Sequence, residues 1–406
     1  MTTVPSVTAL IPTFNRAQFL GASLDSVLRQ TLPPAQVVVI NDGSTDNTRE
    51  IVGPYMSRIE YLEKPNGGKS SALNLGLSRV TGDYVWILDD DDVAFPDLLE
   101  RHLRILEANR DVGFTYSGHL VVTSGPDGTN FEVVGECRMP EFPEDELLIR
   151  HMEGAIKMLL QGAVVRTSCY REVGLFDTEM IRSQDHEMFG RLLRLFHCAR
   201  VSGPTFYLRQ HSGLRGAAEG LFPVRQNDAR WRQYHQIIYK RIRHELPLRE
   251  YLPRSWGRDG MGRAEERRAY LQRMAIMAAN GFFEEMLEDL KSALADGSDR
   301  RPLTDAEQSI LWLTMSTPLR DDAVFKRPEY LRRMQLLCWS TLGRQVQFEL
   351  ARGLFWRFSL ALRLRDFTHA FQLIRSARWL VGFRRAATFA AKKLAFRSSP
   401  SGKELG

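Results

Sequence analysis

The chain has 406 residues, of which 43% are hydrophobic, so it is long enough to form two domains with separate cores. Its four cysteines lie far apart without paired spacing, which argues against a zinc or disulfide framework and favours a reducing compartment. No uncharged run reaches the roughly 18 apolar residues of a membrane-spanning helix, and no basic-then-apolar leader opens the sequence, so we expect a cytoplasmic protein.

Short apolar runs alternate with helical stripes over the first 90 residues. The sequence predicts strands at residues 7–11, 37–40, 59–62 and 84–88, with helical spacing near 20–28, 45–56 and 73–77. This order predicts an α/β fold with a Rossmann-like, doubly wound, mostly parallel sheet. The ligand crevice of such a sheet lies beyond the carboxyl ends of its strands. The polar runs 12–16, 41–44 and 89–92 all fall there.

Beyond Phe114 the pattern becomes mixed and then helical. A hairpin is expected at residues 124–128, and helices are expected at 144–152 and 185–196. Farther on, the sequence predicts helices at 264–279, at 282–294 and after a capping box at 304–307. We therefore expect a first domain at residues 1–221, a connector at 222–262 and a smaller all-α C-terminal domain at 263–406.

Four consecutive aspartates, Asp89 to Asp92, follow the strand predicted at 84–88. Because four like charges repel one another, their concentration at a strand end indicates that a divalent cation compensates them. Hard carboxylate oxygens favour Mg²⁺ or Mn²⁺. The alternative is a solvated acidic turn that caps the next helix.

Asp42 lies in the run Asn41-Asp42-Gly43-Ser44-Thr45-Asp46, between a predicted strand and a predicted helix. A carboxylate there can accept the ring N3–H of uracil or thymine, and Gly43 allows close approach of the backbone. The alternative is a simple turn with Ser44 or Thr45 as the helix N-cap.

The run from Pro65 to Ser71 contains Gly-Lys-Ser but is not a Walker A loop, because Glu63 stands where that loop requires its first glycine. A glycine-rich turn before a helix can still approach a diphosphate through backbone N–H groups and the Lys69 ammonium. The alternative is an ordinary strand-to-helix turn with an exposed lysine.

Two further residues are candidates for chemistry. Asp185 begins an amphipathic helix, whose N-terminus stabilises a carboxylate and suits a general base. His211 follows an apolar strand between hydrogen-bonding neighbours. Taken alone, Asp185 can be a plain helix-capping residue and His211 an ordinary surface or core histidine.

These runs, taken in order over about residues 5–213, resemble the family 2 glycosyltransferases, which have the GT-A fold and invert the anomeric configuration. The matching segments are Ile11 to Arg16, Asn41 to Asp46, Asn66 to Asn74, Leu88 to Asp92, Gly174 to Asp177, and Gln184-Asp185. One departure is Gln184, because the family often has glutamate before the catalytic aspartate.

The resemblance implies a role for each matching position. Asp185 would be the catalytic base, Asp42 would contact the nucleotide base, and Asp91 and His211 would approach the metal. The nucleotide-sugar would be bound by a set at the strand ends: Pro12, Thr13, Asn15, Arg16, Asp42, Gly68, Lys69, Asp89 and Asp90.

The expected reaction is a single, metal-dependent displacement, with Mn²⁺ or Mg²⁺ as cofactor. The donor would be a UDP- or dTDP-sugar, and the acceptor a hydroxyl of a glycan or lipid-linked molecule in polysaccharide or glycoconjugate assembly. Two alternatives are a nucleotide-sugar-binding scaffold without turnover and a nucleotidyltransferase. The second would need a glycine-rich basic loop after the first strand, where this chain has Pro12-Thr13-Phe14.

Basic residues are concentrated at the C-terminus. From Gly343 onward 13 basic residues face three acidic ones, which more than accounts for the net charge of +6. Residues 375–396 predict a helix with an apolar face and a basic face, which suits peripheral contact with the inner face of an anionic membrane. The alternative is a helix that packs on the protein with solvated charges. Nucleic-acid binding is not expected, because no binding module accompanies the charge.

Overall fold

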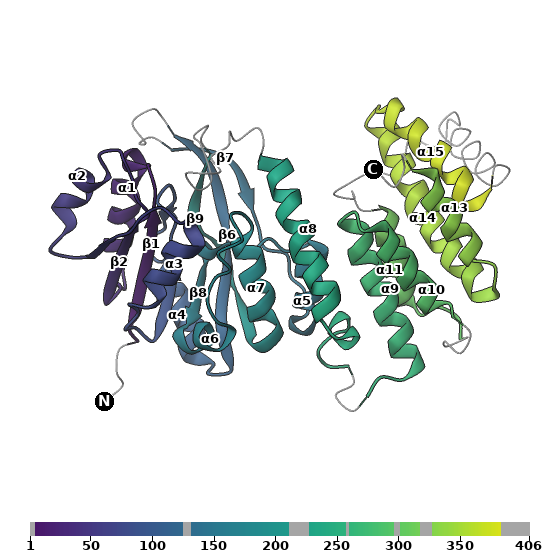
Figure 1. Cartoon of the computed structure of the whole chain (residues 1–406), viewed down its shortest axis with the longest axis horizontal. Helices are drawn as coiled ribbons and strands as arrows, with labels where there is room; N and C mark the ends of the chain where they lie inside the picture. Colours follow the sequence, from purple (N-terminus) through teal and green to yellow (C-terminus); the bar gives the residue numbers. More distant parts are fainter. Residues whose placement is uncertain are drawn as a thin grey trace, which may run out of the picture. The chain divides into compact units, whose positions relative to one another are not determined.

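The computed structural model describes residues 5–124, 131–210, 227–256, 260–295, 301–316 and 327–382. The chain divides into two compact units, residues 1–238 and 239–406 (Figure 1). The boundary falls inside helix α8, Asn227–Glu245, within the segment expected to act as a connector. The first unit is an α/β domain and the second is entirely helical in its described part.

The first four strands form the predicted parallel sheet. They are β1 (Val7–Thr13), β2 (Gln36–Asn41), β3 (Glu60–Glu63) and β4 (Tyr84–Ile87), in the spatial order β3-β2-β1-β4. Every residue of β1 is buried, as expected for a strand covered on both faces. Thr13 lies opposite Asn41 across β1 and β2, so the loops that follow these strands leave the same edge of the sheet.

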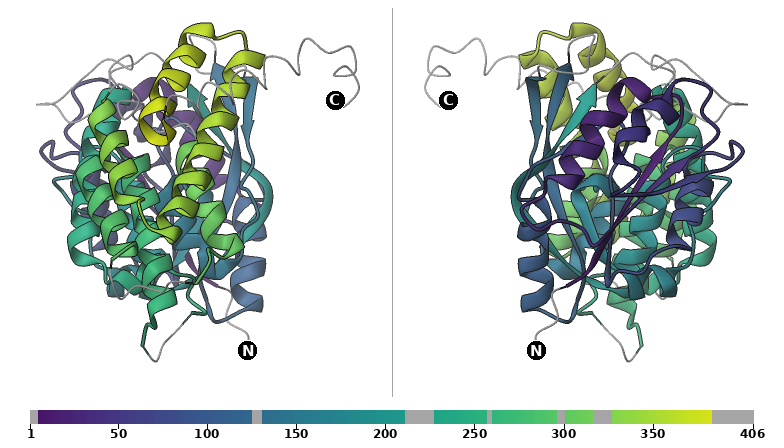
Figure 2. Two further views of the ribbon diagram at one scale, coloured as in Figure 1. Left: turned by 90° about the vertical axis from the view of Figure 1, so that its right-hand side faces the viewer. Right: turned by 90° about the vertical axis from the view of Figure 1, so that its left-hand side faces the viewer.

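Helices α1 (Ala17–Leu28), α3 (Lys69–Leu77) and α4 (Leu98–Ala108) accompany this sheet, and the right-hand view of Figure 2 shows the purple N-terminal helices against its strands. The apolar stripe of α1 is buried in the core. Helix α2, Thr48–Val52, is shorter than the predicted 45–56, because Gly53 and Pro54 continue it only as a 3₁₀ turn, η1 (Gly53–Tyr55).

The second half of the sheet combines parallel and antiparallel pairings. Strand β8 (Ala163–Arg166) is antiparallel to β4 and β6 (Val112–Ser124), whereas β9 (His197–Gln210) is parallel to β6. The short β5 (Val93–Ala94) pairs with β9 and brings the segment after the four aspartates against that strand. Strand β7 (Phe131–Cys137) pairs antiparallel with β6, and the linking residues 125–130 of the expected hairpin lie outside the described part.

Short helices fill the connections of this half. They are α5 (Leu147–Glu153), preceded by the 3₁₀ turn η2 (Glu144–Glu146), η3 (Leu160–Gly162), α6 (Thr167–Val173) and α7 (Gln184–Leu195). The helices predicted at 144–152 and 185–196 are thus confirmed, each within a few residues of its expected ends. Helix α7 carries the predicted base, Asp185, in its first turn.

The helical unit contains the 3₁₀ turn η6 (Leu248–Tyr251), α9 (Arg263–Ala279), α10 (Phe283–Ala293), α11 (Asp305–Ser316), α13 (Pro328–Leu337), α14 (Thr341–Arg363) and α15 (Phe367–Val381), shown in green and yellow in Figure 2. The predicted capping box at the start of α11 is present: Thr304 N–H donates to Glu307 at 2.8 Å, and Glu307 N–H donates to the Thr304 hydroxyl at 3.3 Å. Glu307 also forms a buried ion pair with Arg267 of α9.

Among the described residues, none of the helices combines the length and apolarity that crossing a bilayer requires. Only the first part of the basic helix predicted at 375–396 belongs to α15, and residues 383–406 lie outside the described part. Leu380, which lies on its predicted apolar side, is buried in the helical unit.

Candidate active site

The four aspartates lie at the carboxyl end of β4, at the edge of the sheet where the sequence places them. Asp90, Asp91 and Asp92 are buried and Asp89 is half-buried. The Asp92 N–H donates to the Asp89 carbonyl oxygen at 3.2 Å, so the run forms a tight turn after the strand. Buried carboxylates are unfavourable unless cations or hydrogen-bond donors compensate them, and the surrounding side chains show how this is done.

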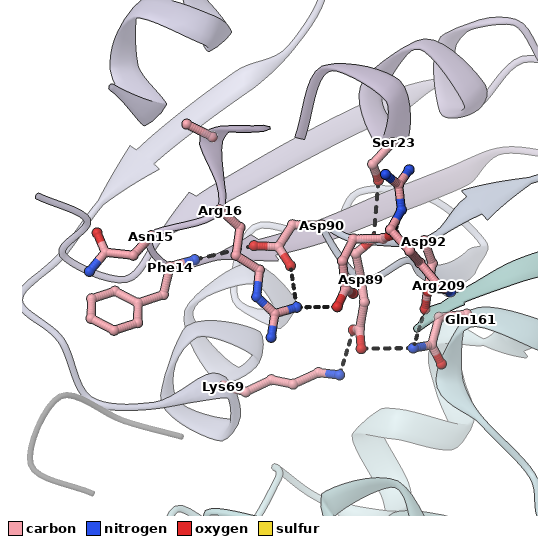
Figure 3. A network of polar contacts seen from close by, with 12 residues as sticks. Phe14, Asn15, Arg16, Ser23, Lys69, Asp89, Asp90, Asp92, Gln161 and Arg209 are labelled. Atoms are coloured by element: carbon pink, nitrogen blue, oxygen red, sulfur yellow. Dashed lines mark hydrogen bonds and ion pairs between the residues drawn. The ribbon is translucent and has the colours of Figure 1, made fainter. Parts of the chain in front are cut away.

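Two predicted binding residues supply positive charge to this turn (Figure 3). Arg16, at the start of α1, donates to Asp90 at 3.2 Å and also contacts Asp91. Lys69, the first residue of α3, contacts Asp89. Burial lowers the pKa of Lys69, but the charge and hydrogen bond of Asp89 outweigh this effect and raise it overall. Both cations therefore stay charged at neutral pH and hold the carboxylates in place.

The aspartate turn fits a divalent cation. Carboxylate oxygens of Asp89, Asp91 and Asp92 lie within 4.8 Å of one another, and all are hard ligands. Burial, followed by the charges of Asp91 and Asp89, raises the pKa of Asp92 well above its usual value. This excess of buried negative charge is what a bound cation would relieve. The sequence named Asp91 and His211 as metal ligands; the structure adds Asp89 and Asp92, and His211 lies outside the described residues.

Two residues that hold this turn were not among the predicted site residues. The Gln161 amide nitrogen, from η3, bridges two carboxylates, donating to Asp89 at 2.7 Å and to Asp92 at 2.9 Å. Arg209 of β9 donates its backbone N–H to Asp92 at 2.9 Å and its Nε–H to the Asp91 carbonyl oxygen at 2.8 Å. Arg209 is 2% exposed, and no local sequence pattern marks either residue as part of the site.

Asp42 is an anchor for the glycine-rich turn. Its Oδ1 accepts from the Lys64 ammonium at 2.5 Å and from Gly67 N–H at 3.0 Å. Its Oδ2 accepts from Asn66 Nδ2 at 3.2 Å and from Gly68 N–H at 2.7 Å. The carboxylate is 3% exposed, so four donors surround a buried negative charge. In this conformation the Gly68 N–H is directed at Asp42. Gly68 has a φ of 85°, in the left-handed region of backbone conformation that favours glycine.

The loops after β1 and β2 are tied together by Asn15. Its backbone N–H donates to the Ser44 hydroxyl at 2.9 Å, and its side-chain oxygen accepts from Thr45 N–H at 2.7 Å. Ser44 and Thr45 therefore do not cap α2, which begins later, at Thr48. Pro12 and Thr13 are buried at the end of β1, directly before this loop. The predicted residues of β1 and β2 thus meet at one edge of the sheet.

Asp185 lies in the first turn of α7, and one of its carboxylate oxygens accepts from His186 N–H at 2.8 Å. It is near enough to Lys69 for its charge to help raise the pKa of that ammonium. The residue before the helix is buried Ser183, whose φ of 63° is unusual for a residue with a side chain. Lys69 thus contacts the aspartate turn through Asp89 and is also close to the predicted base, Asp185.

Comparison with known proteins finds glycosyltransferases. Residues 8–139 match the family described as glycosyl transferase family 2. An uncharacterized glycosyltransferase of Rickettsia felis is 29% identical over 201 residues, which cover 47% of this chain and 32% of that protein. A hyaluronan synthase of Pasteurella multocida is 31% identical over 192 residues, covering 47% of this chain and 19% of that protein. The chain spans 28% to 59% of the length of the Rickettsia proteins that it matches.

The family match and these relatives support a family 2 glycosyltransferase domain with the GT-A fold in the N-terminal part of this chain. Among solved structures, that of S. aureus TarS 1–349 in complex with UDP-GlcNAc has a TM-score of 0.47 and 15% identity, covering 89% of this chain and 92% of the other.

Proposed function

We propose that the chain is a metal-dependent, inverting glycosyltransferase that moves a sugar from a UDP- or dTDP-sugar to an acceptor hydroxyl. The observation that carries this proposal is the placement of Lys69 between two sets of carboxylates. It contacts Asp89 of the aspartate turn and is electrostatically coupled to Asp185 of α7. One ammonium thus contacts the acidic turn proposed for the donor and is influenced by the charge of the candidate base.

The donor half of the proposal rests on the aspartate turn and its cations. Asp89, Asp91 and Asp92 would hold Mn²⁺ or Mg²⁺, which supplies positive charge to a diphosphate when bound. Arg16 and Lys69 already lie against these carboxylates and are protein cations that phosphate oxygens could contact. They would exchange a carboxylate partner for the diphosphate and stabilise the negative charge that develops on it.

The acceptor half rests on Asp185. The positive end of the α7 dipole favours the ionised carboxylate, which a general base requires. Asp185 would remove the proton from the acceptor hydroxyl as its oxygen attacks the anomeric carbon from the side opposite the leaving group. One such displacement inverts the anomeric configuration and needs no covalent intermediate.

The preference for uracil or thymine depends on Asp42, whose carboxylate would accept the ring N3–H. Because four donors already surround this carboxylate, base binding requires Lys64 or Asn66 to turn aside. The match to a hyaluronan synthase supports a glycan or lipid-linked acceptor in polysaccharide or glycoconjugate assembly.

The test measures nucleoside diphosphate release from a panel of UDP-, dTDP- and GDP-sugars with Mn²⁺. We expect one donor to be used, and Asp91→Asn and Asp185→Asn to lower release by at least about 10²-fold. Asp111→Asn, at an exposed aspartate remote from the site, is the matched control. If the wild type binds a donor but releases no nucleoside diphosphate, even with glycan acceptors supplied, the chain would instead be a nucleotide-sugar-binding scaffold.

Peripheral membrane contact is a separate part of the proposal. Its support is the exposure of Phe367 and Phe371, at 64% and 66%, at the start of α15, together with the basic composition of the C-terminus. Flotation with vesicles containing anionic lipid should be lost in the Phe367→Ser/Phe371→Ser double variant, whereas Leu336→Ser, at another exposed apolar residue, should leave it unchanged.

A further inference from the structure

The helical unit carries a groove between α11 and α14 that the proposed reaction does not use. Its volume is about 400 Å³, within the range of small-molecule sites. Its walls come from one residue of α11 and one face of α14, and the lining residues are Trp312, Arg352, Phe355, Trp356, Ser359, Leu360 and Arg363. Both helices are labelled in Figure 1.

A glycine brings the two helices together at this groove. A Cβ atom on Gly353 would lie 2.3 Å from the carbonyl oxygen of Trp312, so the backbones of α14 and α11 approach as closely as only glycine allows. The close approach places the indole of Trp312 beside that of Trp356, one helical turn from Gly353. The groove is therefore held by backbone packing, and its shape is built into the helical unit.

The two indoles form a corner. Their centroids are 5.6 Å apart and their planes are inclined at 67°, an edge-to-face arrangement that leaves ring faces available to a third group. Trp356 is 46% exposed, although burying an indole is favourable. The apolar C–H face of a pyranose packs well against such a ring face, while its hydroxyl groups stay in contact with water.

Two arginines give the groove its charge. Arg352 donates one N–H to Glu349 at 2.7 Å and has other guanidinium donors. Arg363 is exposed and makes no ion pair with any residue that the structure describes. Guanidinium groups bind carboxylate and phosphate through paired hydrogen bonds, and Arg363 has this capacity unused.

We propose that this groove binds a segment of an anionic sugar chain, with pyranose rings on Trp312 and Trp356 and acidic groups on Arg352 and Arg363. The inference rests on the proposed function, because the sugar chain would be the acceptor or product of the transferase. The groove would hold that chain while its end is extended, so the helical unit would contribute to acceptor affinity and leave the chemical step unchanged.

The direct test is calorimetric titration of the full chain with a hexamer of galacturonic acid, with maltohexaose as the neutral counterpart. The wild type should bind the acidic hexamer with a Kd on the order of 1 mM or tighter and the neutral one at least tenfold more weakly. Trp356→Ala and Arg363→Gln should each weaken acidic-hexamer binding at least tenfold. Both residues are exposed, so the fold should tolerate these changes, and thermal unfolding would verify this.

Matched controls lie elsewhere on the helical unit. Trp339→Ala, at an indole that is 76% exposed, and Arg375→Gln should leave binding within twofold of the wild type. Absence of binding in the wild type, equal binding by all variants, or equal affinity for the neutral hexamer would overturn the inference. Nucleoside diphosphate release is measured in parallel with a saturating glycan acceptor: its absence in the wild type counts against the proposed function, whereas unchanged release in the groove variants isolates the groove.

Discussion

Replacing Asp42 by asparagine should open the glycine-rich turn before α3. The substitution removes the negative charge and places an amide N–H₂ where Oδ1 or Oδ2 now accepts two donors. Lys64, whose side chain is 18% exposed, then loses its ionic partner and keeps its hydrogen bond to the Pro65 carbonyl oxygen at 2.6 Å. Removing one partner of a buried ion pair costs about 3–5 kcal/mol, and the partial exposure of Lys64 favours the low end, about 3 kcal/mol.

Because the donors that Asp42 binds are all within the turn, most of this free energy should appear as local opening. About 3 kcal/mol corresponds to an increase of roughly 10²-fold in the opening equilibrium. Hydrogen exchange of the Gly67 and Gly68 amides measures it directly, since both now donate to Asp42. Asp83→Asn, at an exposed carboxylate that bonds Ser6, is the control and should not change exchange in the turn.

Lys64→Met distinguishes the two roles of Asp42. If the carboxylate chiefly anchors the turn, Lys64→Met should also speed exchange at Gly67 and Gly68, and donor affinity should fall in both variants. The reasoning is refuted if Asp42→Asn abolishes donor binding while exchange at both glycines stays as slow as in the wild type. That result would assign Asp42 to the nucleotide base alone.

Three further predictions concern other parts of the molecule. Ser183→Val should lower turnover about 5- to 30-fold with unchanged donor Kd, whereas Ser183→Gly should keep turnover, because a φ of 63° costs a branched residue roughly 1–2 kcal/mol and glycine nothing. Glu307→Gln should destabilise the helical unit by about 3–5 kcal/mol in thermal unfolding, since it removes the carboxylate charge from the buried pair with Arg267; Glu284→Gln, in an exposed pair with Arg333, should not change the midpoint. Burial lowers the pKa of His102 to about 3, so the unfolded chain binds a proton near pH 6.5 that the folded chain refuses. The stabilising contribution of neutral His102 is complete above pH 6.5 and declines as pH falls, by roughly 2 kcal/mol at pH 5. His102→Gln should therefore flatten the dependence of the free energy of unfolding on pH between 6.5 and 5.

The sheet could be predicted from the sequence because its signals are local. Apolar runs and helical stripes depend on neighbouring residues, and the rule that ligands bind at the carboxyl ends of parallel strands then places Arg16, Asp42 and Asp89 at one edge. The capping box at Thr304 was equally readable, since both of its hydrogen bonds link residues three apart.

The contacts that hold the site residues in place could not be predicted in the same way. Gln161 reaches Asp89 across 72 positions and Arg209 reaches Asp92 across 117, and no local pattern marks either residue. The anchoring role of Asp42 depends on how residues 64–68 fold back over it. The apolar side of the basic C-terminal helix suited either a membrane or the protein interior, and in its described part Leu380 is buried inside the helical unit.

The central claim is that Asp185 acts as the base in a single inverting displacement at the aspartate turn. The most direct test is proton NMR of the product formed from an α-linked nucleotide-sugar and a glycan acceptor, recorded for the wild type and for Asp185→Asn. The account predicts a β-linked product from the wild type and none from Asp185→Asn at matched protein concentration. An α-linked product, or a β-linked product formed by Asp185→Asn at the wild-type rate, would contradict it.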